Sequence, residues 1–183
     1  MKHLTTDIEG VLILERAISE DQRGSFERLY CSDTLGSICG FEHVAQANFS
    51  RTSKAGSVRG MHLQLAPESE KKLITCTQGE VFDVAVDMRE GSPTFLKHVS
   101  IELNSVDARS VLIPDGVAHG FQSLSNNASL VYFHSRNYSQ NHELGFNPFD
   151  PRLGIAWPLE VTDISSKDEN HEFIKSNFTG LTL

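Results

Sequence analysis

The chain has 183 residues, a length at which one domain buries roughly two thirds of the surface of its unfolded chain, so we expect a single domain over residues 1–183. Its formal net charge of −8 argues against nucleic acid and membrane surfaces as partners, because both select basic faces. Cys31, Cys39 and Cys76 are odd in number and lack paired spacing, which predicts buried, reduced thiols and no disulfide framework.

The first residues, 1–9, carry acidic side chains and no apolar stretch of the kind that secretory signals contain. No segment approaches the ~20 apolar residues of a membrane-spanning helix. We therefore expect a cytoplasmic protein.

Short strands joined by turns are the pattern of the chain. Residues 10–15 form a first expected strand, and residues 21–24 a turn in which Gly24 can adopt positive φ. Residues 79–87 are the clearest strand, because their side chains alternate in a period of two.

Two further strands are expected at residues 111–113, ended by a turn at 114–116, and at residues 130–136. Alternation in the latter puts Tyr132, His134 and Arg136 on one face. Helix signals are confined to short segments starting near Ser32 and Ser165. The sequence therefore predicts an all-β fold, either a closed barrel or a sandwich.

The segment from Arg59 to Gln64 sets an imidazole near a permanent cation. His62 could take and return a proton near neutral pH. Arg59 and His62 are an odd number of positions apart, so they share a face only if a bulge intervenes, which Gly60 would allow. The alternative is a core histidine bonded to the backbone.

Cupin barrels hold a metal through two histidine-containing motifs. The segment around His62 and the segment 114–121, which contains His119, are similar to these two motifs. Gln64 occupies the usual second histidine position, and an amide is a poor ligand for zinc or iron. We predict no metal and no cofactor, with a metal-dependent cupin oxygenase as an alternative.

Two further positions could move or steer protons. Tyr132 could donate a proton if nearby cations stabilise its phenolate, or it could be a packed aromatic. Asp168 could fix the tautomer of an imidazole, or it could belong to a solvated charged run. Fingerprints of acyl transfer, nucleotide hydrolysis and hydride transfer are absent.

In several segments the chain resembles the dTDP-4-dehydrorhamnose 3,5-epimerases, which are cupin-fold sugar-nucleotide epimerases. The matching segments are residues 21–26, 57–64, 79–87, 91–95, 113–121 and 150–158. The resemblance implies a cupin-type jelly-roll β-barrel with a few short helices and a C-terminal tail packed on the barrel. It also implies a homodimer that exchanges N-terminal strands.

The resemblance further assigns roles to residues. It implies that His62 is the base, Asp168 its partner, Tyr132 the proton donor on the opposite face and Lys72 the group that stabilises the enolate oxygen. Positions that match the nucleotide-sugar pocket of the family are Arg23, Phe26, Gln46, Asn48, Arg59, His119 and Tyr138.

The implied reaction inverts C3, C5 or both in a dTDP-4-keto-6-deoxyhexose through an enolate. Single inversion at C3 or C5, as in pathways to unusual deoxysugars, remains an alternative. So does a cupin that binds sugar nucleotides without turning them over. A 3,4-ketoisomerase is disfavoured, because those relatives carry different histidine motifs.

Overall fold

The computed structural model describes residues 1–183 and consists mainly of β-strands. The elements in chain order are β1 (Lys2–Thr5), β2 (Leu12–Glu15), β3 (Ile18–Asp21), β4 (Gly24–Glu27), α1 (Ser32–Cys39), β5 (Gln46–Thr52), β6 (Ser57–Gln64), β7 (Lys72–Gln78), β8 (Glu80–Asp87), β9 (His98–Asn104), β10 (Arg109–Ile113), β11 (Val117–Ser123), β12 (Ala128–His134), β13 (Glu143–Gly145), β14 (Asp163–Ile164) and α2 (Ser166–Glu169).

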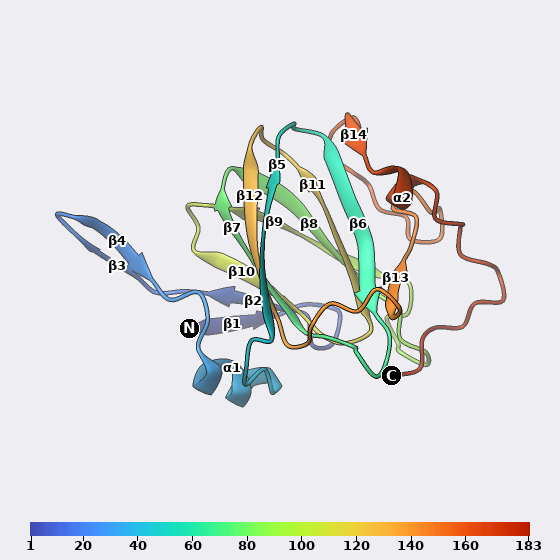
Figure 1. Cartoon of the computed structure of the whole chain (residues 1–183), viewed down its shortest axis with the longest axis horizontal. Helices are drawn as coiled ribbons and strands as arrows, with labels where there is room; N and C mark the ends of the chain where they lie inside the picture. Colours follow the sequence, from blue (N-terminus) through green and yellow to red (C-terminus); the bar gives the residue numbers. More distant parts are fainter.

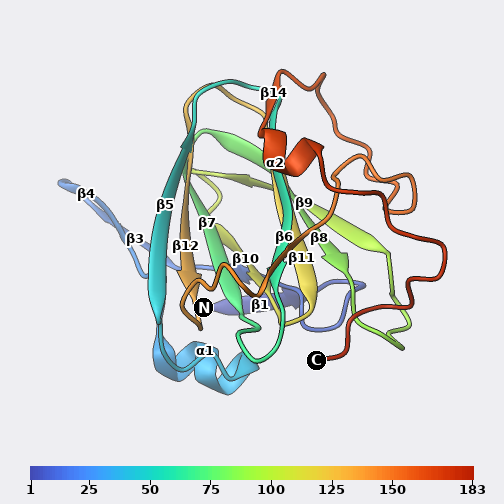
Figure 2. The same ribbon diagram turned by 45° about the vertical axis from the view of Figure 1, so that its right-hand side comes forward.

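Two sheets face each other across the main core (Figure 1 and Figure 2). The first has the order β1-β2-β10-β7-β12-β5, and the second β13-β6-β11-β8-β9, with β14 added alongside β6. The prediction of an all-β jelly roll is confirmed. The hydrogen bonding does not run around a closed barrel, however, because the two sheets share no strand.

Strand β8 shows why alternation predicted this sheet well. Val81 and Ala85 point into the core between the sheets, whereas Val84 and Val86 pack in a second apolar cluster on the outer face. The outer face is buried because residues after β13, among them Trp157 and Phe178, cover it. Both faces of the strand are therefore buried.

The bulge anticipated at Gly60 is present in β6. His62 pairs with His119 and Arg59 pairs with Phe121, so two residues of β6 stand opposite Gly120 alone. Gly60 has φ +118°, and a Cβ there would lie 2.5 Å from the Cα of Gly120. The bulge brings Arg59 and His62 to the same face, where both line the cavity described below.

The hairpin of β3 and β4 projects away from both sheets (Figure 1 and Figure 2). Its turn includes Gly24 with φ +130°, as expected. Phe26 is 73% exposed and Ile18 43% exposed. Large apolar side chains left exposed on a projecting hairpin are typical of a segment that contacts a second chain.

Two local expectations need correction. Arg136 lies beyond the end of β12, so it does not share the regular face of Tyr132 and His134. Cys31 and Cys39 are only half-buried, and Cys76 alone is buried.

Neither helix has the length and hydropathy that crossing a membrane requires.

Candidate active site

A cavity of about 1080 Å³ opens between the two sheets. Its walls are formed by β5, β7 and β12 on one side and by β6 and β11 on the other, with α2 and the segment before it at the rim. The volume reaches the upper end of the range found for small-molecule sites, so a nucleotide-sized ligand fits.

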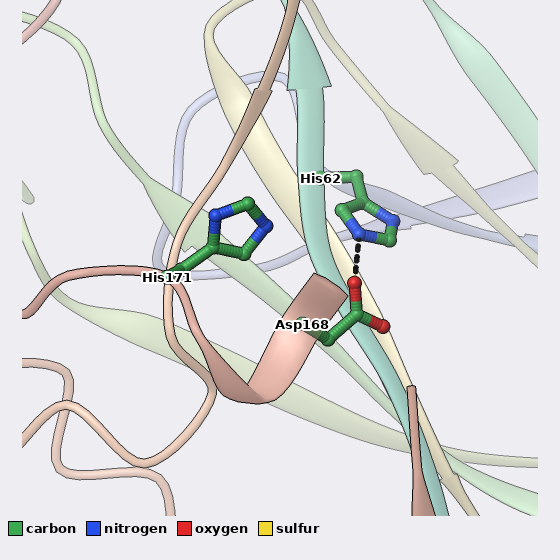
Figure 3. Close-up of side chains that lie close together, drawn as sticks. All are labelled: His62, Asp168 and His171. Carbon is green, nitrogen blue, oxygen red and sulfur yellow. Dashed lines mark hydrogen bonds and ion pairs between the residues drawn. The ribbon is translucent and has the colours of Figure 1, made fainter. Parts of the chain in front are cut away.

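His62 and Asp168 form a hydrogen-bonded pair in the wall of this cavity. The Nε2 atom of His62 lies 2.7 Å from Oδ1 of Asp168, a contact that is drawn as a dashed line in Figure 3. Burial alone would raise the pKa of Asp168, but hydrogen bonds from His62 and from the Gly60 backbone N–H hold that pKa below its ordinary value. An ionised carboxylate at Nε2 keeps the proton there and leaves the lone pair of a neutral His62 on Nδ1.

The C-terminal tail puts Asp168 in place. β14 pairs in parallel with the start of β6, and α2 follows directly after it. Ser165 caps α2 by accepting a hydrogen bond from the backbone N–H of Asp168 at 3.0 Å. The sequence left two alternatives for Asp168, a partner of an imidazole or a member of a solvated charged run. Asp168 is buried, with 4% of its surface exposed, and it bonds to His62.

Tyr132 extends from β12, in the sheet opposite His62. Its ring packs edge-on to His119 with a centroid distance of 6.1 Å, and His119 is the neighbour of His62 in the second sheet. Burial raises the pKa of Tyr132 well above its usual value, and the charge of Asp83 adds to this. The phenol therefore keeps its proton at neutral pH, which is the form that a proton donor needs.

Lys72 extends from β7 in one wall of the cavity towards β6 in the other. Its Nζ donates to the backbone oxygen of His62 at 3.3 Å and lies 3.3 Å from Oε1 of Glu70. The other carboxylate oxygen of Glu70 accepts from Nδ1 of His134 at 2.8 Å. Nε2 of His134 is then free to accept from the Asn48 amide, 3.4 Å away.

His119 and Gln64, the remaining residues of the cupin-like motifs, have other partners. Nε2 of His119 donates to the buried Asp83 at 2.7 Å. The Gln64 amide donates to two backbone oxygens and its oxygen accepts from the backbone N–H of Ser139. Gln64 thus serves to fix the loop after Asn137.

Five basic side chains line the cavity, and four carboxylates, those of Glu70, Glu143, Asp163 and Asp168, line it as well. The basic side chains that line it are Arg51, Lys54, Arg59, Lys72 and Lys167. Arg59 is held by Thr52 and by the backbone oxygen of Arg51. Local guanidinium and ammonium groups of this kind are what a diphosphate needs.

The structure brings together most of the residues predicted from the sequence. Those that line the cavity are His62, Tyr132, Asp168, Lys72, Asn48, Arg59, His119 and Tyr138. Gln46 lies at its edge, where it bonds to Asn48 and to the backbone N–H of Tyr138. Arg23 and Phe26 do not line it, because they belong to the β3-β4 hairpin, which projects away from the two sheets of the same chain.

Sequence reasoning missed three groups: Glu70, Asp83 and His171. Glu70 and Asp83 are the carboxylates that hold His134 and His119. His171 lies beside His62, with ring centroids 6.4 Å apart. Strand alternation indicated the face of Asp83, but no spacing signal links Glu70 or His171 to the histidines that they approach.

Comparison with known proteins gives a consistent result over nearly the whole chain. A family model described as dTDP-4-dehydrorhamnose 3,5-epimerase matches residues 5–176. The dTDP-4-dehydrorhamnose 3,5-epimerase of Shigella flexneri is 38% identical over 180 residues, which cover 97% of this chain and 99% of the relative. The dTDP-4-dehydrorhamnose 3-epimerase of Streptomyces niveus is 38% identical over 89% of this chain and 79% of its own.

Solved structures agree. The dTDP-6-deoxy-D-glucose-3,5-epimerase of Legionella pneumophila, in complex with dTDP-4-keto-L-rhamnose, superposes with a TM-score of 0.90 at 35% identity, covering 100% of this chain and 98% of that one. A 3'-monoepimerase from Streptomyces bikiniensis, in complex with dTDP-quinovose, gives a TM-score of 0.86 at 34% identity over 92% and 85% of the two chains.

The jelly-roll fold and the agreement of the family model with the curated relatives define a carbohydrate epimerase, which is an isomerase. The chain belongs to the dTDP-4-dehydrorhamnose 3,5-epimerase family.

Proposed function

We propose that this protein epimerises a dTDP-4-keto-6-deoxyhexose at carbons next to the C4 ketone, with His62 as base and Tyr132 as acid. The observation that carries the proposal is that His62, paired with Asp168, and Tyr132 approach the cavity from opposite sheets. Two groups on opposite faces are what inversion requires, since a single base returns the proton to the face it came from.

In the first step Nδ1 of His62 removes the proton from the carbon next to the ketone. The electron pair of the C–H bond forms a carbon-carbon double bond, and the C4 oxygen takes the negative charge. Asp168 stabilises the imidazolium that results. Lys72 provides the cation for the enolate oxygen, and such preorganised charge stabilises the transition state more than the neutral ketone.

In the second step the enolate collapses and the same carbon takes the phenolic proton of Tyr132 from the other face. The products are the ketone with inverted configuration, a phenolate and an imidazolium. Exchange of a proton with solvent restores both side chains. The raised pKa of Tyr132 keeps it in the acid form before each turnover.

A second candidate is inversion at one carbon only. It is favoured by the sequence identity to the 3-epimerase of Streptomyces niveus, which at 38% equals the identity to the 3,5-epimerase of Shigella flexneri. The same two groups serve in either case, because the choice between C3 and C5 depends on which carbon the pocket presents to them.

Incubation with dTDP-4-keto-6-deoxyglucose in D₂O tests the proposed reaction. Loss of the proton signals of C3, C5 or both by NMR is expected, with inversion at each exchanged carbon. A protein that binds the nucleotide sugar while both signals persist would be a binding module, and the proposal would be wrong.

We further infer that the working unit is a homodimer in which each β3-β4 hairpin completes the partner's cavity. The inference is supported by the projecting hairpin, by its exposed Phe26, and by the position of Arg23 outside its own chain's cavity. Arg23 is 90% exposed at its side chain and bound only to Asp21 on the same turn. Its guanidinium is therefore available to a diphosphate across the interface.

A further inference from the structure

His171 places a third side chain against the His62-Asp168 pair, as Figure 3 shows. One ligand-capable atom from each of the three residues lies within 4.8 Å of the others. Nε2 of His171 is buried and has no hydrogen-bond partner. A buried polar atom without a partner needs an explanation in terms of what it binds.

The position of His171 is fixed by its surroundings. Asn147 donates to the backbone oxygen of His171 at 3.0 Å, and α2 ends just before it. Its ring occupies the space over Gly145, the residue that pairs with His62 across β13 and β6. Because Gly145 has no side chain, the imidazole of His171 can occupy the space beside His62.

We propose that His62, Asp168 and His171 form a binding site for Zn²⁺, and that occupation of this site switches the enzyme off. Two imidazoles and one carboxylate are a ligand set that suits zinc, with a fourth position left to water. Hard cations such as Mg²⁺ prefer all-oxygen shells and are disfavoured. Ligand atoms around tetrahedral zinc stand about 3.3 Å apart, so Nε2 of His62 and Oδ1 of Asp168 need only separate slightly from 2.7 Å.

Inhibition follows from the tautomer of His62. In the metal-free enzyme Asp168 accepts the Nε2 proton, and the lone pair that serves as base lies on Nδ1. Zinc on Nε2 takes the place of that proton, so a neutral His62 must carry its proton on Nδ1. The lone pair that abstracts the substrate proton is then gone. This consequence rests on the proposed role of His62, whereas zinc binding itself does not.

Calorimetric titration of the full-length, chelator-treated protein with ZnCl₂ tests the site. We expect one high-affinity Zn²⁺ per chain and no response to MgCl₂. His171→Gln should weaken zinc binding by at least about tenfold, because loss of even an outer-shell partner weakens metal sites by that factor. The matched control is His142→Gln, which removes another half-buried histidine and should leave the zinc affinity unchanged.

A second variant protects the test against misfolding of the first. Gly145→Ala adds a Cβ that would collide with the His171 ring while Gly145 itself has no positive φ, so it should displace the ligand and weaken zinc binding likewise. Failure of wild-type protein to bind Zn²⁺, or equal zinc affinity in wild type and both variants, would overturn the site.

The switch is tested separately by deuterium exchange into the substrate. Stoichiometric Zn²⁺ should stop exchange in the wild type, EDTA should restore it, and His171→Gln should need more zinc by the factor seen in calorimetry. Exchange that continues in the zinc-loaded enzyme would overturn inhibition. Absence of exchange without zinc would instead contradict the proposed function, with the calorimetric result still decisive for the site.

Discussion

One carboxylate, that of Glu70, holds both His134 and Lys72. Its Oε2 lies 2.8 Å from Nδ1 of His134, and its Oε1 lies 3.3 Å from Nζ of Lys72. Burial would raise the pKa of Glu70, but hydrogen bonds from His134 and the charge of Lys72 bring it below its ordinary value. The Glu70 carboxylate is therefore ionised in the folded protein and balances a buried ammonium in the wall of the cavity.

Glu70→Gln should destabilise the protein by about 3 kcal/mol, because it leaves the buried Lys72 cation without its partner. The check is urea unfolding at neutral pH. Glu102→Gln, on an exposed position of β9, is the control and should change the free energy of unfolding by no more than about 0.5 kcal/mol. Equal stability of the two variants would show that the pair contributes nothing.

Acid stability should depend on Asp87, which is fully buried. Burial raises its pKa, but hydrogen bonds from Arg89, Ser92 and Thr94 outweigh this and lower the pKa from 3.8 to about 2. Because the folded value is the lower one, the ionised carboxylate stabilises the fold above pH 3.8, and this contribution of about 2 kcal/mol is lost as the pH falls towards 2.

Asp87→Asn should therefore remove that part of the pH dependence, so the stability gap to wild type narrows between pH 5 and pH 2. Urea unfolding across this range measures it. Asp7→Asn, at an exposed carboxylate, should keep the wild-type profile, and parallel profiles for Asp87→Asn and wild type would contradict the assignment.

The β6 bulge should tolerate no side chain at Gly60. An alanine Cβ would lie 2.5 Å from the Cα of Gly120 and 2.8 Å from the backbone oxygen of His119. We expect Gly60→Ala to lower the free energy of unfolding by more than about 3 kcal/mol. Gly40→Ala, also at positive φ but in open space, should lose only about 1 kcal/mol. Similar losses for both would mean that the close approach of β6 and β11 is not constrained.

Subunit exchange of the hairpin can be tested with mixed dimers. His62→Asn removes the base and Arg23→Ala removes the hairpin cation, so each homodimer should be impaired, the former by about 10²–10⁴ in rate. After random mixing, about half of the dimers are heterodimers. If Arg23 serves the partner, one of the two cavities in each heterodimer is intact, so the mixture should have about a quarter of wild-type activity. No recovery on mixing, in protein that light scattering shows to be dimeric, would place Arg23 outside the partner's site.

The bulge beside His62 and the strands β8 and β12, the second of which carries Tyr132, were predictable from local signals. A glycine between two polar residues at odd spacing indicated the bulge, and the period of two indicated β8 and β12. Strand β5 gave no such signal, because one of its faces lines a wet cavity and the other is exposed to solvent.

Contacts between distant segments were not predictable in this way. Alternation tells which residues of one strand share a face, but it cannot say which tail residue lies beside them. Asp168 was assigned to His62 through the family resemblance, and Glu70 and His171 were missed because each meets its histidine only after the chain has folded.

If His62 and Tyr132 act on opposite faces of one carbon, Tyr132→Phe should separate loss of the proton from inversion, and incubation of this variant with substrate in D₂O measures both. Deuterium content and configuration at C3 and C5 are read from the same NMR sample. We expect the variant still to introduce deuterium, since His62 removes and returns the proton, but with the original configuration kept. Inversion at the wild-type rate in Tyr132→Phe would contradict it.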